Sequence, residues 1–171
     1  MMINILQPRP AIPILLFLIC LKWGDWKNWR KYYSTILYVI IWVLFYEFFY
    51  KEYPLWRFKN NTFSVLLIMC ISFPSSILLY LPYVEKQSMT KQILHIALWT
   101  FLFSLFEAIS IATHTISYYH GWNFCYSIGF NVLTFCMIRL HYKNALLAWP
   151  ISVFLFIAAM IIFRLPLSSL L

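Results

Sequence analysis

The chain has 171 residues, of which 63% are hydrophobic, 21% aromatic and only 11% charged. A soluble domain of this length needs far more charge to cover its surface, and the same composition excludes intrinsic disorder, a disulfide scaffold and a collagen-like fibre. Lys and Arg outnumber Asp and Glu by 13 to 5, but they stand in short segments between apolar runs, which is typical of membrane topology signals. The sequence therefore predicts an all-α polytopic membrane protein.

Six apolar runs approach the length of about 20 residues that a helix needs to cross the hydrocarbon core of a bilayer. We expect a single transmembrane helical domain over 1–171, a bundle of six spans. Five spans are the alternative, because prolines interrupt the first run and the fifth run is short. No small-residue cleavage site follows the first run, so we expect it to be retained as an anchor. The predicted spans are 3–21, 32–50, 62–84, 93–116, 124–138 and 145–163.

The basic residues divide unevenly between the two sides that these spans define. Eight of them lie in the segments 22–31, 85–92 and 139–144, which share one side, and five lie on the other. The positive-inside rule then places both termini outside. We expect a multi-pass protein of the plasma membrane whose basic loops contact anionic lipid headgroups. A membrane-protein partner or a homo-oligomer is compatible with the sequence, and we expect no nucleic-acid partner.

Glu47 is one of only two acidic residues inside the predicted spans. An ionised carboxylate near the bilayer centre costs at least about 2.5 kcal/mol, so each of the two needs an explanation. Glu47 stands near the end of the second span, four residues before Lys51. This spacing lets the two side chains pair at the membrane interface. A structural ion pair and a functional carboxylate are both open for Glu47.

Pro74 interrupts the third run near its midpoint, among three serines. A proline frees a backbone carbonyl that nearby hydroxyl groups can bond. We expect a kink at this position, and the alternative is a half-helix end that lines a cavity.

Glu107, the second acid, lies slightly past the middle of the fourth run. Four other polar residues recur at intervals of three to four on the same helix face, next to a ridge of small residues. These four are Thr100, Ser104, Ser110 and His114. We therefore expect the fourth helix at the centre of the bundle, with Glu107 either protonated or hydrogen-bonded to a partner.

Topology places several polar residues at a similar depth. If the second and fourth spans both run outward, Glu47, Glu107 and His114 fall in the outer half of the membrane. His120 then lies in the following outer loop, and Asn131 lies at mid-depth in the fifth span. We expect these groups to converge on an outward-facing polar cavity around Glu107. The candidate ligand- or proton-binding residues are Glu107, His114, Asn131, Glu47, Ser104, Ser110 and His120.

The sequence contains no motif typical of a bound cofactor, and we expect none. A helical zinc pair needs histidines at i and i+4, as in H-E-x-x-H, and no such pair occurs. The four cysteines form no C-x-x-C pair. One alternative is a metal site of His114, His120 and Glu107, which would require the tertiary structure to bring these residues together.

Four short segments carry a resemblance to a known family. They are Lys31-Tyr32-Tyr33-Ser34-Thr35, Tyr53-Pro54-Leu55-Trp56, His120-Gly121-Trp122-Asn123 and Arg139-Leu140-His141-Tyr142-Lys143. In these segments the chain resembles an uncharacterised group of small polytopic membrane proteins from endospore-forming Firmicutes. The resemblance implies a Gram-positive plasma membrane, including one made during sporulation, and it assigns no reaction and no catalytic residue.

The function that the sequence favours is non-enzymatic. We expect an accessory, sensory or permease-like protein that takes up a proton or a small polar ligand at Glu107, with His114 and Asn131 as hydrogen-bonding partners. The alternative is a membrane-embedded metal-dependent hydrolase or lipid-modifying enzyme that uses His114, His120 and Glu107. A third, purely structural class predicts that Glu107→Leu is tolerated.

Overall fold

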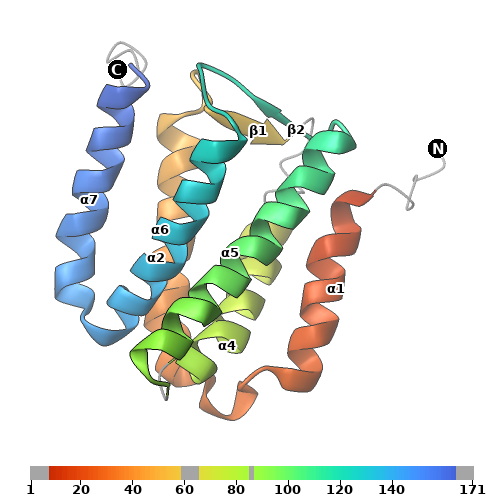
Figure 1. The fold of residues 1–171 in the computed structure, drawn as a ribbon, viewed down its shortest axis with the longest axis vertical. Helices are drawn as coiled ribbons and strands as arrows, with labels where there is room; N and C mark the ends of the chain where they lie inside the picture. The colour runs from red at the N-terminus through yellow and green to blue at the C-terminus, as the bar shows by residue number, and fades with distance from the viewer. Residues whose placement is uncertain (1–7, 59–65, 85–86, 165–171) are drawn as a thin grey trace.

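A computed structural model describes residues 8–58, 66–84 and 87–164, with side chains described from residue 13 onward in the first range. Six α-helices run side by side along the longest axis of this part of the chain (Figure 1). The predicted span starts at 3–7 and 62–65 lie outside the described residues. The α-helices are α1 (Pro8–Trp23), α2 (Trp29–Phe49), α4 (Phe73–Val84), α5 (Met89–Ala112), α6 (Phe124–Lys143) and α7 (Ala145–Ile162). Two short helical segments, η1 (Trp26–Asn28) and η2 (Ile68–Ser72), precede α2 and α4.

Four helices are long and apolar enough to cross a membrane. They are α5, α6, α7 and the continuous segment Trp26–Phe49 that contains α2. Their outer faces carry large apolar side chains, such as Phe154, which is 69% exposed, and Ile161, which is 71% exposed. Water would solvate such a surface poorly, whereas lipid chains match it. The prediction of a helical transmembrane protein is confirmed to this extent.

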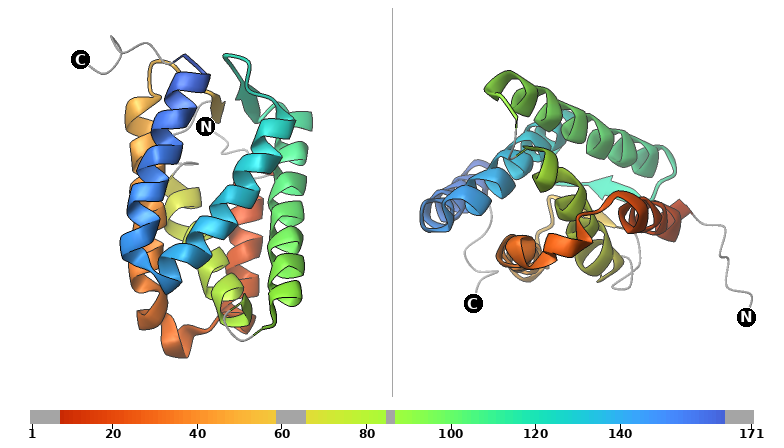
Figure 2. Two further views of the ribbon diagram at one scale, coloured as in Figure 1. Left: turned by 60° about the vertical axis from the view of Figure 1, so that its left-hand side comes forward. Right: turned by 90° about the horizontal axis from the view of Figure 1, so that it is seen from below.

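The connections between helices alternate between two ends of the bundle. The turns from α1 to α2 and from α6 to α7 lie at the same end as the start of α5, and two short strands lie at the opposite end (Figures 1 and 2). We call these the turn end and the strand end. The basic segments 22–31 and 139–144 thus share an end with the start of α5, as predicted.

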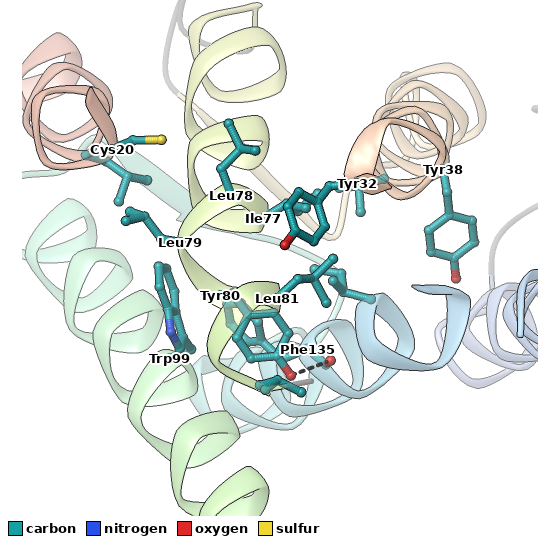
Figure 3. Packing of buried hydrophobic residues seen from close by; sticks show 14 residues of the cluster. Cys20, Tyr32, Tyr38, Ile77, Leu78, Leu79, Tyr80, Leu81, Trp99 and Phe135 are labelled. Atoms are coloured by element: carbon teal, nitrogen blue, oxygen red, sulfur yellow. Dashed lines mark hydrogen bonds between the residues drawn. The ribbon is translucent and has the colours of Figure 1, made fainter. Parts of the chain in front are cut away.

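The centre of the bundle is α4, not α5 (Figure 2, right). It packs against α1, α2, α5 and α6, and eight of its twelve residues are buried. Tyr80 of α4 donates a hydrogen bond to the Phe135 carbonyl at 3.0 Å, and its ring contacts those of Phe135 and Trp99 (Figure 3). The prediction that the fourth span is central is therefore wrong. Apart from two small serines that are themselves buried, α4 carries apolar and aromatic side chains, which suit full burial, whereas one polar stripe needs only one neighbour.

The interruption at Pro74 takes the form of a π-helical turn, η2, directly before α4. The wider turn bonds the Phe73 amide to the Ile68 carbonyl. One turn later, the Ser76 hydroxyl donates to the Ser72 carbonyl at 2.7 Å, as expected for a serine beside a helix irregularity. The helix continues through Pro74, so the alternative of a half-helix end is not observed.

A two-stranded antiparallel sheet closes the strand end, where the sequence predicted only loops. Strand β1 (Trp56–Phe58) pairs with β2 (Ile116–Tyr118) in the register Trp56↔Tyr118, Arg57↔Ser117 and Phe58↔Ile116. Since the two strands lie far apart in the sequence, their pairing joins the end of α2 to the end of α5.

The chain can reach β2 because α5 ends four residues before the predicted limit of the fourth span. The His114 amide bonds the Ile111 carbonyl, and the Thr115 amide bonds the Ser110 carbonyl at 2.7 Å. These two bonds form a Schellman motif, with His114 in the left-handed region at φ 54°. The prediction that His114 continues the polar stripe of the helix is therefore wrong.

Candidate functional site

Glu107 lies on α5, five residues before the helix ends at Ala112. This distance corresponds to about 7.5 Å of helix. The side chain is half-buried and faces the contact between α5 and α6 near the strand end. Glu107 is thus nearer to one end of its helix than the sequence predicted, because the helix begins and ends earlier than the predicted span.

Two neutral groups hydrogen-bond the Glu107 carboxylate. The Tyr118 hydroxyl donates to Oε1 at 2.8 Å, and Asn131 Nδ2 donates to Oε2 at 3.5 Å. Asn131 Nδ2 also donates to the hydroxyl of the buried Ser104 at 3.3 Å. We refer to these four residues, from α5, α6 and β2, as the Glu107 cluster. Of the predicted site residues, Asn131 and Ser104 do lie beside Glu107.

Tyr118 was not among the predicted site residues. It reaches Glu107 because the Schellman motif reverses the chain and β2 runs back over the end of α5. The signal in the sequence is the short run Thr115 to Tyr118, whose β-branched and aromatic residues favour a strand over a loop.

The hydrogen-bond network continues from Tyr118 into α6. Ser127 of α6 lies near the Tyr118 hydroxyl, and Trp122 Nε1 donates to the Ser127 hydroxyl at 2.7 Å. Burial raises the pKa of Tyr118 well above its usual range, the bond with Ser127 opposes this rise, and Glu107 adds to it. Tyr118 therefore stays a neutral hydrogen-bond donor towards Glu107.

The side chain of Tyr46 joins the strand pair that carries Tyr118 to α2. Tyr46 donates to the Trp56 carbonyl at 2.7 Å and accepts from the amides of Leu55 and Trp56 at 3.2 and 3.0 Å. The rings of Tyr46 and Trp56 also stack, with centroids 4.0 Å apart. Hydrogen bonds thus connect Tyr118 through β2 and β1 to the end of α2.

The other predicted site residues lie outside the Glu107 cluster. His114 is exposed at the end of α5, and the exposed His120 stacks on Tyr53 with ring centroids 3.3 Å apart. The Ser110 hydroxyl bonds the Phe106 carbonyl of its own helix at 2.8 Å. Glu47 is exposed on α2. The predicted convergence of these four residues on Glu107 is therefore not observed.

The predicted interfacial ion pair of Glu47 with Lys51 does not form either, although both residues are described. The basic group whose charge acts on Glu47 is Arg57 of β1. Arg57 in turn hydrogen-bonds the backbone carbonyl of Lys51. The formation of β1, which the sequence did not predict, brings the charge of Arg57 towards Glu47, but the two described side chains form no ion pair.

Within the described ranges, no group of three or more His, Cys, Asp or Glu side chains is placed to hold a metal ion. The alternative site of His114, His120 and Glu107 is thus not assembled. The left-handed conformations of His114 and His120 belong to the turns on either side of β2.

A second polar cluster lies in the half of the bundle towards the turn end. His141 Nδ1 and the Thr35 hydroxyl are 3.1 Å apart, and the His141 ring stacks on Tyr38 at 4.1 Å between centroids. The Tyr38 hydroxyl bonds the hydroxyl of Ser152. We refer to these four residues, from α2, α6 and α7, as the His141 cluster.

The sequence placed His141 in a basic segment after the fifth span, but the side chain is only 4% exposed. The reason is that α6 continues to Lys143, beyond the predicted end at 138. Phe135, Ile138 and His141 then follow one another at intervals of three on the buried face of the helix.

No protein family, curated protein or solved structure matches this chain. The interpretation of the Glu107 cluster therefore rests on its own chemistry.

Proposed function

We propose that the chain is a plasma-membrane protein of six spans, with both termini outside, in which the Glu107 cluster takes up a proton or a small polar ligand from the outer side. Its role is non-enzymatic, and the sensory form is favoured over an accessory or permease-like form. The resemblance to small membrane proteins of Firmicutes agrees with a Gram-positive plasma membrane.

Two observations support six spans. The helix α1 has 16 residues and the apolar segment Ile68–Val84 has 17. At 1.5 Å per residue they extend for about 24 and 26 Å, close to a hydrocarbon core of about 30 Å. Both run alongside the four longer helices (Figure 2, left), so that six helices together would cross the bilayer.

The distribution of basic residues supports the orientation. The turn end has the larger set, and the positive-inside rule assigns it to the cytoplasm and the strand end to the outside. Lys59, Lys86 and the side chain of Arg9 lie outside the described part of the chain. The described basic residues near the turn end are Lys22, Lys27, Arg30, Lys31, Lys91, Arg139 and Lys143, and those at the strand end are Lys51, Arg57 and Arg164.

The observation that carries the proposed activity is the pair of neutral donors, Tyr118 and Asn131, on a half-buried carboxylate in an apolar helix. Hydrogen bonds stabilise the ionised form, but they leave its negative charge uncompensated in a medium of low polarity. No basic side chain bonds Glu107 in the part of the chain that the structure describes. A proton or a small cationic or polar ligand supplies the missing partner.

The hydrogen bonds of Tyr118 favour the sensory form. Protonation converts one carboxylate oxygen from an acceptor into a donor, so that one of the two bonds to Glu107 must rearrange. Since Tyr118 belongs to β2, and β2 is paired with β1, a proton at Glu107 changes how the strand end is held. The strand end is the natural output of such a sensor.

The test is a pair of conservative variants in the full chain, Glu107→Gln and Glu47→Gln. Each protein is reconstituted in phosphatidylcholine vesicles, and infrared difference spectra are recorded as the pH is lowered. We expect the wild type and Glu47→Gln to show a protonated-carboxyl band together with a change in tyrosine modes. Glu107→Gln should lose both, because glutamine fills the same space and accepts the Tyr118 bond but does not titrate.

Two outcomes would contradict the proposal. One is an unchanged tyrosine response in a Glu107→Gln protein whose circular dichroism shows a normal helix content. The other is stoichiometric metal in the purified protein that is lost when His114 or His120 is replaced, since this would restore the enzymatic alternative.

A further inference from the structure

A groove of about 340 Å³ runs between α1 and α2 on the side of the bundle away from the Glu107 cluster. Both helices pack against α4 and η2, and they stand on either side of α4 when the bundle is viewed from the turn end (Figure 2, right). The space between them is floored by Cys70, Ile71 and Pro74. Its volume lies within the range of about 300–1,000 Å³ that is typical of small-molecule sites.

The walls of the groove are almost entirely apolar. Phe17 contributes from α1 and Ile36 from α2, and Leu78 extends the apolar lining along α4. Phe17 is 37% exposed, so the groove opens to the outer surface of the helices. In a bilayer, a surface groove of this chemistry is filled by hydrocarbon.

At the turn end, two tryptophans, Trp26 and Trp29, complete the lining. Tryptophan favours the depth of the lipid headgroups, where one edge of the ring is wet and the other apolar. These two residues therefore mark the level at which the groove passes from acyl chains to headgroups.

Two cations follow these tryptophans along the chain, next to this end of the groove. Lys27 and Arg30 are exposed beside the two tryptophans, and the Arg30 guanidinium lies 5.9 Å from the ring centroid of Trp29. Asp25 is the only acid in the segment 22–31. Its carboxylate accepts bonds from the Tyr32 hydroxyl at 2.9 Å and from the side chain of Asn28 at 2.9 and 3.1 Å. Neither Lys27 nor Arg30 forms an ion pair within the described residues, so both cations can bind an external anion.

We propose that this groove holds one acyl chain of an anionic phospholipid, whose phosphate group contacts Lys27 and Arg30. The apolar length of the groove accounts for the chain, and the cations at its headgroup end account for the selectivity for negative charge. The site depends on the membrane location of the protein and not on any role of Glu107.

The test uses the full chain in a mild detergent, with phosphatidylglycerol and phosphatidylcholine of identical acyl chains added in equal amounts. Native mass spectrometry counts the lipid retained by each protein. We expect the wild type to retain one phosphatidylglycerol in preference to phosphatidylcholine. The larger side chain of Cys70→Phe fills part of the groove and displaces the acyl chain. Retention of both lipids should fall about tenfold, which is the loss of affinity expected when two methylene groups of the chain leave the groove.

The charge is tested separately. Arg30→Gln should lower retention of phosphatidylglycerol about fivefold and leave phosphatidylcholine unchanged, which separates the headgroup contact from the chain contact. The matched controls are Cys136→Phe, at an exposed cysteine of α6 outside the groove, and Lys143→Gln, at the turn end of the same helix. Both controls should behave as the wild type.

Equal retention by Cys70→Phe and Cys136→Phe would overturn the proposal, and so would equal retention of the two lipids by the wild type. If Cys70→Phe unfolds, a phosphatidylglycerol that carries a diazirine in its acyl chain tests the site in the wild-type protein. Cross-links on α1, α2 and η2 are expected. Cross-links confined to α5 or α7 would show that the lipid binds elsewhere.

Discussion

Both polar clusters place hydrogen-bonding side chains among apolar helices, and they differ in how far these side chains are shielded from the surroundings. In the His141 cluster, all four side chains are buried, with exposures of 0% for Thr35 and at most 8% for the others. In the Glu107 cluster, Ser104 is buried, but Glu107, Tyr118 and Asn131 are only half-buried. A polar group in an apolar helix needs a partner in both cases. The His141 cluster is therefore closed to its surroundings, whereas the Glu107 cluster is open, because three of its side chains are partly exposed.

The clusters also differ in the charge that they can carry. Hydroxyl groups and an imidazole can satisfy one another while all remain neutral, as Tyr38, Ser152, Thr35 and His141 do. A carboxylate bonded only by neutral donors cannot lose its charge without taking up a proton. The comparison teaches that a closed neutral cluster holds helices together, whereas an open cluster with one acid can respond to its surroundings.

The largest expected effect tests the structural role of the closed cluster. His141→Ala removes the ring that stacks on Tyr38 and leaves the Thr35 hydroxyl without its partner in a buried site. The free energy of unfolding in detergent should fall by about 3 kcal/mol, with a cavity and an unpaired hydroxyl both contributing. Under the same conditions Glu107→Gln should lose less than about 1 kcal/mol. Similar losses for the two variants would remove the distinction between the clusters.

A pair of glycines compares the packing of the two ends in the same way. A Cβ atom at Gly24, in the first turn of the turn end, would lie 2.5 Å from the Cys20 carbonyl oxygen and 2.7 Å from Cys20 Sγ. Gly24→Ala should therefore cost about 2 kcal/mol of unfolding free energy. Gly129, on α6 towards the strand end, has open space around it. Gly129→Ala should raise stability by up to about 1 kcal/mol through helix propensity. Thermal unfolding of both variants checks the contrast, and a loss at Gly129 would contradict it.

A third pair of variants tests which hydroxyl responds to pH. Tyr118→Phe removes the bond to Glu107 and should cost about 1.5 kcal/mol with the carboxylate ionised, because hydrogen bonds to charged groups are the stronger ones. The proposed uptake of a proton by Glu107 predicts that this cost shrinks as the pH is lowered. Tyr38→Phe removes a bond between neutral groups and should cost about 1 kcal/mol at every pH. Denaturant titrations at several pH values measure both. A constant cost for Tyr118→Phe would show that Glu107 does not change its protonation state.

The smallest expected effect concerns Asp25, at the turn end. Burial by itself would raise the pKa of this carboxyl, but bonds from Tyr32 and Asn28 and the charge of Lys31 together lower it below the ordinary value of 3.8. The lowered pKa means that Asp25 stabilises the fold above about pH 4, and that this contribution is lost as the pH falls through the folded-state value. Asp25→Asn should cost less than about 1 kcal/mol at neutral pH, since the side chain is only half-buried and water screens its interactions. The variant should also flatten the acid side of the stability profile. A steeper acid side would contradict this assignment.

Much of the fold could be predicted from the lengths of the apolar runs. Each of the six predicted spans overlaps a helix, because length and hydropathy decide whether a segment is a long apolar helix. The helical spacing of Ser104 and Glu107 predicts that they share a face, and Asn131, expected as a hydrogen-bonding partner of Glu107, lies 3.5 Å from its carboxylate. These inferences depend on local geometry, which the sequence expresses directly.

What could not be predicted depends on how helices end and which helix lies between the others. A Schellman motif with a non-glycine residue in the left-handed position has a weak sequence signal, so His114 was assigned to the helix and Tyr118 was missed. The burial of His141 follows from where α6 ends, and the exposed position of α5 follows from competition with the more apolar α4. The end of a helix and the choice of the buried helix depend on interactions between segments, so the identity of a single residue does not predict them.

The hydroxyl group of Tyr46 has one donor and two acceptor positions, and the strand end uses all three of them. Removal of this one oxygen atom, as in Tyr46→Phe, would break all three bonds at once, and release of β1 from α2 requires the loss of all three. Partial detachment would leave backbone groups without partners next to a stacked ring, which is less favourable than either the attached or the fully detached arrangement. The strand end should therefore have two states, with β1 either attached to α2 or detached from it. A gradual change in conditions at its surface would then shift the protein from one state to the other in a cooperative step.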